Sequence, residues 1–287
     1  MSTLWKDIKF KMLHSGSRIT MLIWINVIVY LVINIPNVFL LLSTGNTIIR
    51  DKTDEYLELS AYYPLLLKHF WTPITYQFMH ATVWHIIMNM VWLYWMGQIF
   101  EEFLGNKKVI GLYLMGGLAG ALFFVLGFNY IPIFANSGMV HIPIVGASAA
   151  VMAILIATAT LLPDYTMMLF LIGPVRLKWL ALVYVIIDFL MIAEGNPGGE
   201  LSHLGGALFG FIYIKQLQRG NDMVGFFTNL FKKRSKLKVV SRNTIKGIKP
   251  SQQEIDRILD KISESGPDSL TKQEKEILLR ASKDNES

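Results

Sequence analysis

Residues 145–150 read Val-Gly-Ala-Ser-Ala-Ala and open an apolar run that continues to Leu162. After the valine, this stretch contains only glycine, alanine and one serine, Ser148. Small side chains let two helix backbones approach closely, and such contacts are typical of helices packed inside a membrane. Ser148 would then lie in the contact between two helices, which makes its hydroxyl the first candidate for a reactive group.

The composition indicates a polytopic membrane protein. Of the 287 residues, 53% are hydrophobic and 17% are charged, and the mean hydropathy is +0.42, which is too apolar for an ordinary soluble domain. The net charge of +6 gathers in the tails and short connections, as is typical of the flanks of membrane helices, and this disfavours nucleic-acid binding. The absence of cysteine excludes disulfides, thiolate nucleophiles and cysteine-ligated metals.

Long apolar segments predict an all-α bundle of six transmembrane helices. A span needs about 20 apolar residues, and the segments expected to cross the bilayer are 20–43, 77–98, 108–128, 146–163, 177–193 and 201–218. The first lacks a small-residue cleavage pattern, so we expect a retained span and no signal peptide. One membrane domain is therefore predicted over 20–218, after an N-terminal segment, 1–19.

Basic residues predict the orientation. Lys and Arg follow span two, precede span five and close span six, whereas the two short connections on the other side, after span three and after span five, are uncharged or acidic. By the positive-inside rule, we expect both termini to be cytoplasmic and the protein to lie in the cell membrane. The long connection 44–76 mixes charged and aromatic residues and is expected to lie in the membrane interface.

The chain changes character after span six. Residues 219–250 combine apolar side chains with a run of Lys and Arg, which predicts an interfacial, polybasic linker. Residues 251–287 predict a small cytoplasmic hairpin of two helices, broken at Gly266-Pro267, with a capping box of Thr271 and Glu274. We expect this tail to contact anionic lipid or a cytoplasmic adaptor.

Polar side chains inside a span are costly, so each is a candidate for a functional site. Spans two, four and six run in the same direction, which places four such side chains in the outer half of the membrane: His85, Asn89, Ser148 and His203. They have the parts for acyl transfer, namely a hydroxyl nucleophile, an imidazole base and neutral donors for an oxyanion. A single serine in a span is usually a packing residue, and a single histidine is as often a packing or ligand residue as a base. Their common depth is what favours catalysis.

Three motifs follow one another along the chain: His85-x-x-x-Asn89 on span two, Gly146-x-Ser148 on span four and His203-x-x-Gly206-x-x-x-Gly210 on span six. A further motif, Gly97-x-x-x-Glu101-x-x-x-Gly105, ends span two. In their order and in the six-span layout, these motifs resemble the rhomboid intramembrane serine proteases over residues 60–218.

The resemblance implies that Ser148 and His203 form a catalytic dyad. This dyad would hydrolyse a peptide bond in or next to a transmembrane helix of a membrane-protein substrate that enters from the lipid bilayer. The resemblance also implies an oxyanion hole made by Asn89, His85 and Gly146, beside the amide of the serine. It implies no cofactor and no metal.

Two further side chains are accessory candidates. His80 occupies another position of the family, near the mouth of the pore. Asp188 lies in the outer part of span five, at a depth where it could orient His203 as the third member of a triad. The resemblance is to dyad enzymes, so a packing role for Asp188 stays open beside this one.

Three positions differ from the family's common pattern. Ala149 follows the serine where the family often has glycine, which bears on the width of the cleft. Met152 stands where many members carry an aromatic residue against the base. Thr72 follows Trp71 where some members have arginine, which bears on the rigidity of the first outer connection. None of the three removes a catalytic atom.

Two other interpretations compete with the protease. A metal or haem protein would use His80, His85 and His203, but the chain has no His-Glu-x-x-His motif and no cysteine, which disfavours it. A non-catalytic scaffold or transporter would bind transmembrane helices in the same polar layer without cutting them. Transporters usually carry internal repeats, and none is clear in this chain.

Overall fold

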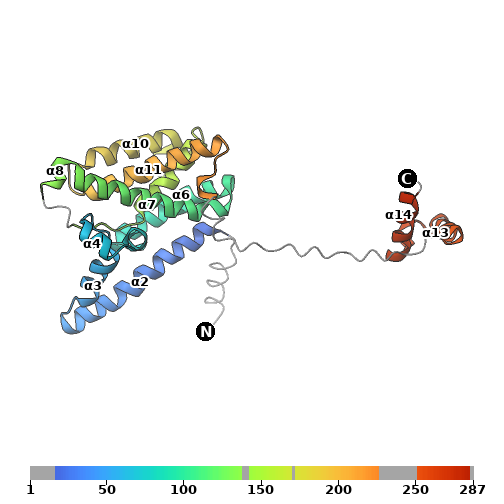
Figure 1. The fold of residues 1–287 in the computed structure, drawn as a ribbon, viewed down its shortest axis with the longest axis horizontal. Coiled ribbons are helices and arrows are strands. Elements are labelled where there is room, and N and C mark those ends of the chain that lie inside the picture. Colours follow the sequence, from blue (N-terminus) through green and yellow to red (C-terminus); the bar gives the residue numbers. More distant parts are fainter. Residues whose placement is uncertain (1–16, 138–141, 170–171, 226–250, 285–287) are drawn as a thin grey trace. The chain divides into compact units, whose positions relative to one another are not determined.

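The structure of the protein is a computed structural model that describes residues 17–137, 142–169, 172–225 and 251–284. Its long helices form where the sequence carries apolar runs. The chain divides into two compact units, Met1–Lys232 and Lys233–Ser287, called here the N-terminal and C-terminal units. The helices that correspond to predicted spans are α2 (Arg18–Thr44), α6 (Val83–Leu104), α7 (Asn106–Tyr130), α9 (Ser148–Leu161), α10 (Leu177–Met191) and α11 (Pro197–Gln218) (Figure 1).

Helix α6 departs most from its predicted bounds. It begins at Val83 rather than at residue 77, because the side chain of Thr82 accepts a hydrogen bond from the backbone N–H of His85 at 3.1 Å and caps the helix. The residues before this cap form a short helix, α5 (Thr72–Thr75), and a 3₁₀ turn, η1 (Tyr76–Phe78). The loop between η1 and α6 therefore carries His80, which the sequence prediction placed inside a span.

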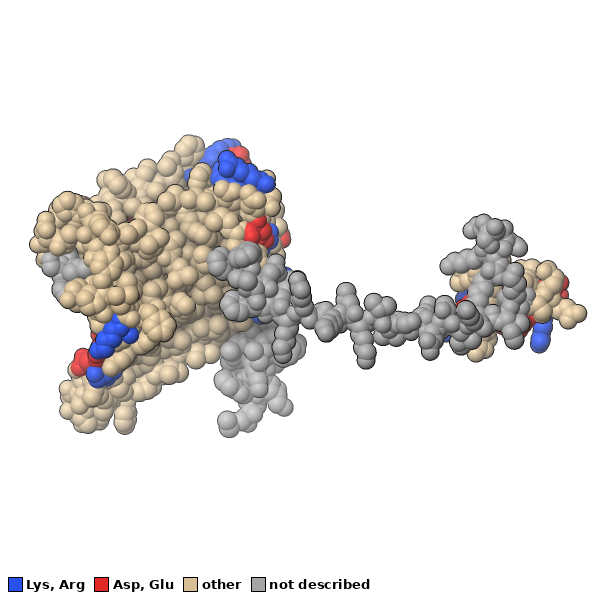
Figure 2. Space-filling model, viewed as in Figure 1, with Lys and Arg blue, Asp and Glu red and all other residues tan. Residues whose placement is uncertain are grey.

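The surface of the N-terminal unit is apolar over long stretches. Helices α2 and α7 are long and apolar enough to cross a membrane, and α9 is a shorter apolar helix. Large side chains are exposed along α2 and α10, such as Leu42 at 82% and Phe189 at 65%. In Figure 2 the visible face of this unit carries its charged side chains in patches near the ends, with uncharged surface between them. A surface of this kind fits contact with lipid, while the arrangement of six spans stays a prediction.

A two-stranded sheet corrects the expectation of an all-α fold. Strands β1 (Thr166–Leu169) and β2 (Gly173–Arg176) pair antiparallel between α9 and α10, with Thr166 opposite Arg176. The sequence prediction treated this stretch as a plain connection. Asp164 bonds Lys178 at 2.6 Å and Arg176 at 3.4 Å beside the hairpin. The fold is thus mostly helical, with one small sheet.

The long connection after α2 folds into short helices, α3 (Ile48–Leu57) and α4 (Tyr63–Lys68), before α5. The indole N–H of Trp71 donates to the carbonyl of Tyr56 at 2.7 Å, and the hydroxyl of Thr72 donates to the carbonyl of His69 at 2.9 Å. The hydroxyl of Thr72 thus stabilises the turn between His69 and Thr72 through its own hydrogen bond. A further tie is an isolated antiparallel bridge between Leu59 and Ile144, with N–H to O distances of 3.1 and 2.8 Å. It joins this connection to the segment before α9, beyond α8 (Pro132–Ala135).

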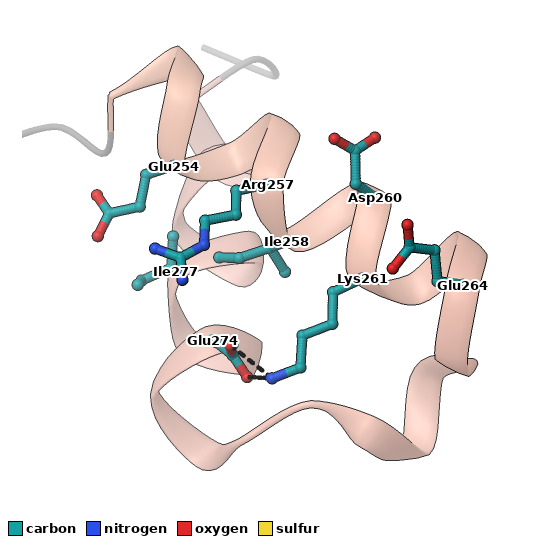
Figure 3. Close-up of a pocket in the computed structure, with 8 residues that line it drawn as sticks. All are labelled: Glu254, Arg257, Ile258, Asp260, Lys261, Glu264, Glu274 and Ile277. Carbon is teal, nitrogen blue, oxygen red and sulfur yellow. Dashed lines mark hydrogen bonds and ion pairs between the residues drawn. The ribbon is translucent and has the colours of Figure 1, made fainter.

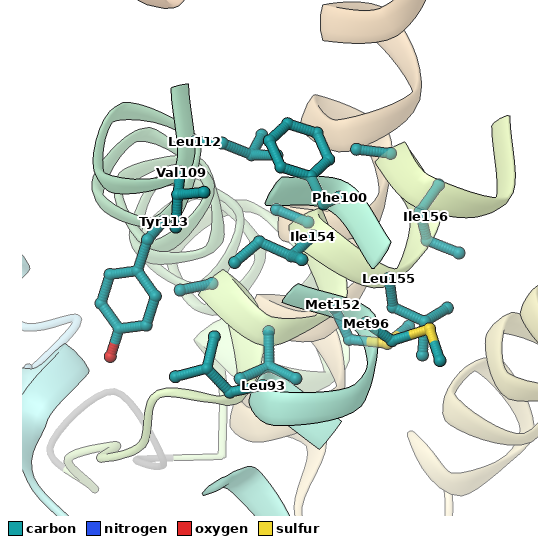
Figure 4. Close-up of a cluster of buried hydrophobic side chains, with 14 of the residues drawn as sticks. Leu93, Met96, Phe100, Val109, Leu112, Tyr113, Met152, Ile154, Leu155 and Ile156 are labelled. Carbon is teal, nitrogen blue, oxygen red and sulfur yellow. The ribbon is translucent and has the colours of Figure 1, made fainter. Parts of the chain in front are cut away.

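Helix α9 lies at the centre of the N-terminal unit. Figure 4 shows its side chains meeting those of α6 and α7 in one apolar cluster. On another side, α9 packs against α11, where glycines allow backbone-to-backbone contact: a Cβ at Gly206 would collide with the carbonyl of Ala149, and one at Gly210 with that of Ala153. The close helix contact predicted from the small residues around Ser148 is therefore confirmed.

The C-terminal unit is a pair of helices, α13 (Gln252–Ser265) and α14 (Lys272–Asp284), joined through η3 (Pro267–Ser269). The predicted capping box is confirmed: the Thr271 hydroxyl accepts from the Glu274 N–H at 3.3 Å, and Glu274 accepts from the Thr271 N–H at 2.7 Å. Lys261 bonds the same carboxylate at 2.9 Å beside a buried Ile258 (Figure 3). The predicted polybasic run in 226–250 lies outside the described residues.

Candidate active site

Ser148 is the first residue of α9. The helix begins there after Ala147, so Ser148 sits at the end where backbone N–H groups have no partner within the helix. Those N–H groups and the helix dipole give this end a partial positive charge, which stabilises an anion placed near it. The Ser148 side chain is half-buried. A nucleophile here has donors for a developing oxyanion beside it.

Gly146 leaves space between Ser148 and His85. Its φ of +138° lies in the region that favours glycine, and its N–H donates to the carbonyl of Tyr76 at 3.0 Å. A Cβ at this position would lie 2.9 Å from both Cε1 and Nε2 of His85 and 3.2 Å from Oγ of Ser148. The absent side chain thus keeps a small gap open between a hydroxyl and an imidazole.

His85, which borders this gap, contacts two other polar residues. Asn89 is 6% exposed, and its side-chain amide donates to the carbonyl of His85 at 3.0 Å. His80 reaches His85 from the loop, with the two ring centroids 5.2 Å apart and the rings at 70°. His80 is 5% exposed, so it forms part of the wall around His85.

His203 lies on α11, one turn before the glycine that contacts α9. This places it on the side of α11 that faces the start of α9, at the level of Ser148. The described side chains include no hydrogen bond between Ser148 and His203, so the predicted dyad stays a prediction. Nδ1 of His203 lies 3.4 Å from Oδ1 of Asp188 and 3.3 Å from Oε2 of Glu200.

The sequence prediction named Asp188 but did not single out Glu200. It began span six at residue 201 and counted Glu200 as a loop charge. In the structure α11 begins at Pro197, since the Asn196 side chain accepts from the N–H of Gly199 at 3.2 Å and caps the helix. The sequence Asn-Pro-Gly-Gly-Glu carried this signal, because asparagine favours the cap and proline the first helical position. Glu200 then falls three residues before His203, on the same face.

Two of the unusual positions are buried. Ala149 is 1% exposed and contacts α11 through its carbonyl, while its side chain faces Gly120 of α7. Met152 is 3% exposed and lies in the apolar cluster with the side chains of α6 (Figure 4). Both residues therefore fill the packing around the start of α9.

Asp188, Glu200 and His203 form the group whose donor atoms converge, all within 4.8 Å of one another. Two carboxylates and an imidazole are ligands that divalent cations accept. His80 and His85 do not belong to such a group among the described residues, so the alternative site of three histidines gains no support.

Comparison with known proteins gives two family matches. Residues 67–219, more than half of the chain, match the family model described as Rhomboid domain. Residues 249–284, which contain α13 and α14, match a family of unknown function.

Curated relatives match over about half of the chain. One is RHOMBOID-like protein 12, mitochondrial, of Arabidopsis thaliana, 32% identical over 52% of this chain and 47% of its own length. Another is Rhomboid protein 1, mitochondrial, of Saccharomyces cerevisiae, 29% identical over 47% of this chain and 38% of its own. Presenilin-associated rhomboid-like protein A, mitochondrial, of Danio rerio is 30% identical over 48% and 35%. The chain thus spans less than half the length of each.

The names of these relatives overturn the predicted location. All three are mitochondrial proteins, which points to a mitochondrial membrane instead of the cell membrane. The prediction of the cell membrane with both termini cytoplasmic is therefore wrong on this finding. The positive-inside pattern on which it rested tells two sides of a membrane apart, but it does not identify the membrane.

Proposed function

The chain belongs to the rhomboid family, and we propose that it is an intramembrane serine endopeptidase with Ser148 as the nucleophile and His203 as the base. Rhomboid proteins act on transmembrane substrates within the bilayer. The reaction proposed for this chain is hydrolysis of a peptide bond in or next to a transmembrane helix of a membrane-protein substrate. The observation that carries the proposal is the gap that Gly146 leaves between Ser148 and His85 at the start of α9.

The first half of the reaction acylates the serine. Oγ of Ser148 attacks the scissile carbonyl carbon, its proton moves to Nε2 of His203, and the carbonyl electrons move to the oxygen. The tetrahedral intermediate collapses by breaking the C–N bond. The leaving amine takes the proton from His203, and an acyl-serine remains.

The second half consumes one water. His203 takes a proton from this water as its oxygen attacks the acyl carbon, and the same proton then returns to Oγ of Ser148 as the ester bond breaks. The products of the whole reaction are the amine released in the first half and the carboxylic acid released in the second, and Ser148 is free again. Each product leaves with one end of the cut helix.

The oxyanion of both intermediates is proposed to lie in the gap at Gly146. The donors would be the backbone N–H of Ser148 and side-chain N–H groups of His85 and Asn89, with the glycine leaving room for the oxygen. Asn89 donates one side-chain amide hydrogen to the His85 carbonyl, so its second amide hydrogen is the one that would bind the oxyanion. His80 supports the position of the His85 ring.

The remaining parts of the chain have proposed roles of their own. Six helices would cross the bilayer within 20–218, with 1–19 before them and an interfacial linker at 219–250. The hairpin of 251–287 would contact anionic lipid or an adaptor protein. Deleting 240–287 should leave the intrinsic cleavage rate unchanged.

Covalent labelling with a fluorophosphonate tests the nucleophile, and cleavage of a transmembrane reporter tests the reaction. We expect wild type to be labelled and to cut, and Ser148→Ala to do neither. His203→Ala should lose at least about 10³-fold in cleavage rate, because serine without a base is a poor nucleophile. Equal labelling of wild type and Ser148→Ala would sink the proposal and favour a scaffold that binds helices without cutting them.

A further inference from the structure

Two carboxylates meet the same nitrogen of His203. Asp188 comes from the end of α10 and Glu200 from the first turn of α11, and their nearest oxygens lie 3.4 and 3.3 Å from Nδ1. That nitrogen carries at most one hydrogen, so it donates to one carboxylate at a time. A triad of the ordinary kind needs one acid at this place, and this chain has two.

Both carboxylates are buried, and His203 is the one ion-pair partner of either among the described residues. The side chains of Asp188 and Glu200 are 7% and 10% exposed, and Oδ2 of the first and Oε2 of the second have no hydrogen-bond donor among the described residues. No Lys or Arg of the described ranges lies within ion-pair distance of either. A glutamate in the first turn of a helix is favoured by the helix dipole, but the dipole does not account for its burial against a histidine.

Two full negative charges at this separation are costly where water is scarce. Carboxylates that share a site lower this cost by holding one proton between them, so that the pair carries a single charge. The donor oxygens here lie within 4.8 Å of one another, so a shared proton requires a side-chain movement that brings two of them to hydrogen-bond distance.

We propose that Asp188 and Glu200 act as one unit, a carboxylate pair with one shared proton and one negative charge, which positions His203 with its hydrogen on Nδ1. This inference rests on the proposed function and names the residues that orient its base. Both acids are positioning residues, because they act on the substrate only through His203. With Nδ1 held as a donor, the lone pair of Nε2 is left to take the proton of Ser148.

The pair has a second consequence during the reaction. When His203 takes the proton of Ser148, the imidazolium that forms lies beside a single negative charge and is stabilised by it. Replacing either acid by its amide removes the shared proton but leaves one ionised carboxylate against Nδ1. Either carboxylate can therefore position His203 alone, and the loss of cleavage rate appears only when both residues are neutral.

Isosteric amides test this redundancy. Asp188→Asn and Glu200→Gln should each lower the kcat of reporter cleavage by less than about 10-fold, whereas the double variant should lose about 10³-fold with little change in KM. The matched control is Glu194→Gln, an exposed carboxylate between the same two helices, which should retain the wild-type rate. A double variant no worse than Asp188→Asn alone would overturn the pair.

The pH dependence separates positioning from a merely structural role. The titratable groups near His203 are Asp188 on α10, Glu200 on its own helix and His85 on α6. Each single variant should keep the acid limb of the rate profile close to that of wild type. In the double variant this limb should move to lower pH, because the imidazolium has lost its negative neighbour. An unmoved limb in the double variant contradicts the proposal.

Spectra of protein labelled with ¹⁵N-histidine decide the question without an activity measurement. With the His203 signals identified through His203→Ala, the Nδ1–H tautomer should dominate in wild type and both single variants and be lost in the double variant. If wild type does not cut, the proposed function fails, while the tautomer still tests the pair. One bound zinc ion per chain, lost in the double variant, would instead show that the acids hold a metal.

Discussion

Helices α9 and α2 are both apolar, but they are held in different ways. The side chains of α9 are buried along nearly its whole length, and its neighbours approach through glycines. In α2, by contrast, burial is confined to Ile19, Leu22 and Asn26 near its start, while the rest of the helix exposes large apolar side chains. The helix with the candidate nucleophile is therefore fixed by protein on all sides, and α2 is fixed at one end only.

The largest effect is expected where α11 meets α9. Gly206→Val would place a branched side chain against the carbonyl of Ala149 and separate the two helices. We expect a loss of about 3 kcal/mol in stability and a loss of activity beyond it, measured by unfolding in detergent and by reporter cleavage. The control is Leu208→Val, two residues on and 44% exposed, which should change little. Full activity of Gly206→Val would show that the contact is looser than described.

The buried end of α2 should be next in importance. The hydroxyl of Tyr113 donates to the carbonyl of Gln77 at 2.9 Å and lies 3.1 Å from the side-chain nitrogen of Asn26. Tyr113→Phe leaves these polar groups buried without their partner, which typically costs about 1–3 kcal/mol. The measurement is again unfolding in detergent. A loss near zero would mean that α2 is not anchored through this network.

The helix that follows α2 should respond to pH. Burial, together with the neighbouring carboxylate of Asp54, raises the pKa of Glu58 to about 7. The protonated form therefore stabilises α3, fully so below the ordinary pKa of 4.5, and this contribution is lost as the pH rises through about 7. Hydrogen exchange of α3 should accelerate between pH 5 and pH 8 after correction for the intrinsic rate. Glu58→Gln should remove this change, and its persistence would assign it to another group.

The smallest effect is expected on the exposed half of α2. Phe39 is 74% exposed, and Phe39→Leu keeps an apolar side chain facing the same surroundings. We expect a change within about 0.5 kcal/mol and an unchanged cleavage rate. A loss as large as that of Tyr113→Phe would reveal a partner covering this half of the helix, and the contrast with α9 would disappear.

Much of the fold could be predicted because long apolar runs leave few alternatives to helices. The bounds of α2, α7 and α10 lie within a few residues of the predicted spans. The prediction was wrong where local caps decide: Thr82 starts α6 late, and Asn196 with Pro197 starts α11 early. It also missed β1 and β2, since a strand pair of four residues each is too short for a periodic signal.

The candidate site could be predicted only in part. The small residues around Ser148 predicted the tight contact with α11. Asp188 was predicted to lie near His203 only from its expected depth in the membrane. The contact between Glu200 and His203 was not predicted, because it depends on where α11 begins. The early start of α11 places Glu200 in the helix, on the same face as His203. The gap at Gly146 also depends on a backbone angle that the pattern of residues does not specify.

The bridge between Leu59 and Ile144, with the bond from Gly146 to Tyr76, bears on the order in which the molecule is assembled. These contacts join residues far apart along the chain, and long loops close more slowly than local turns. The backbone before Ser148 takes its final conformation only when the early connection has met it. A chain still being made, or one that has lost the early connection, would carry Ser148 and His203 but lack the aligned gap at Gly146. If Ser148 is the nucleophile proposed above, the gap beside it forms only after these two distant segments of the chain have met.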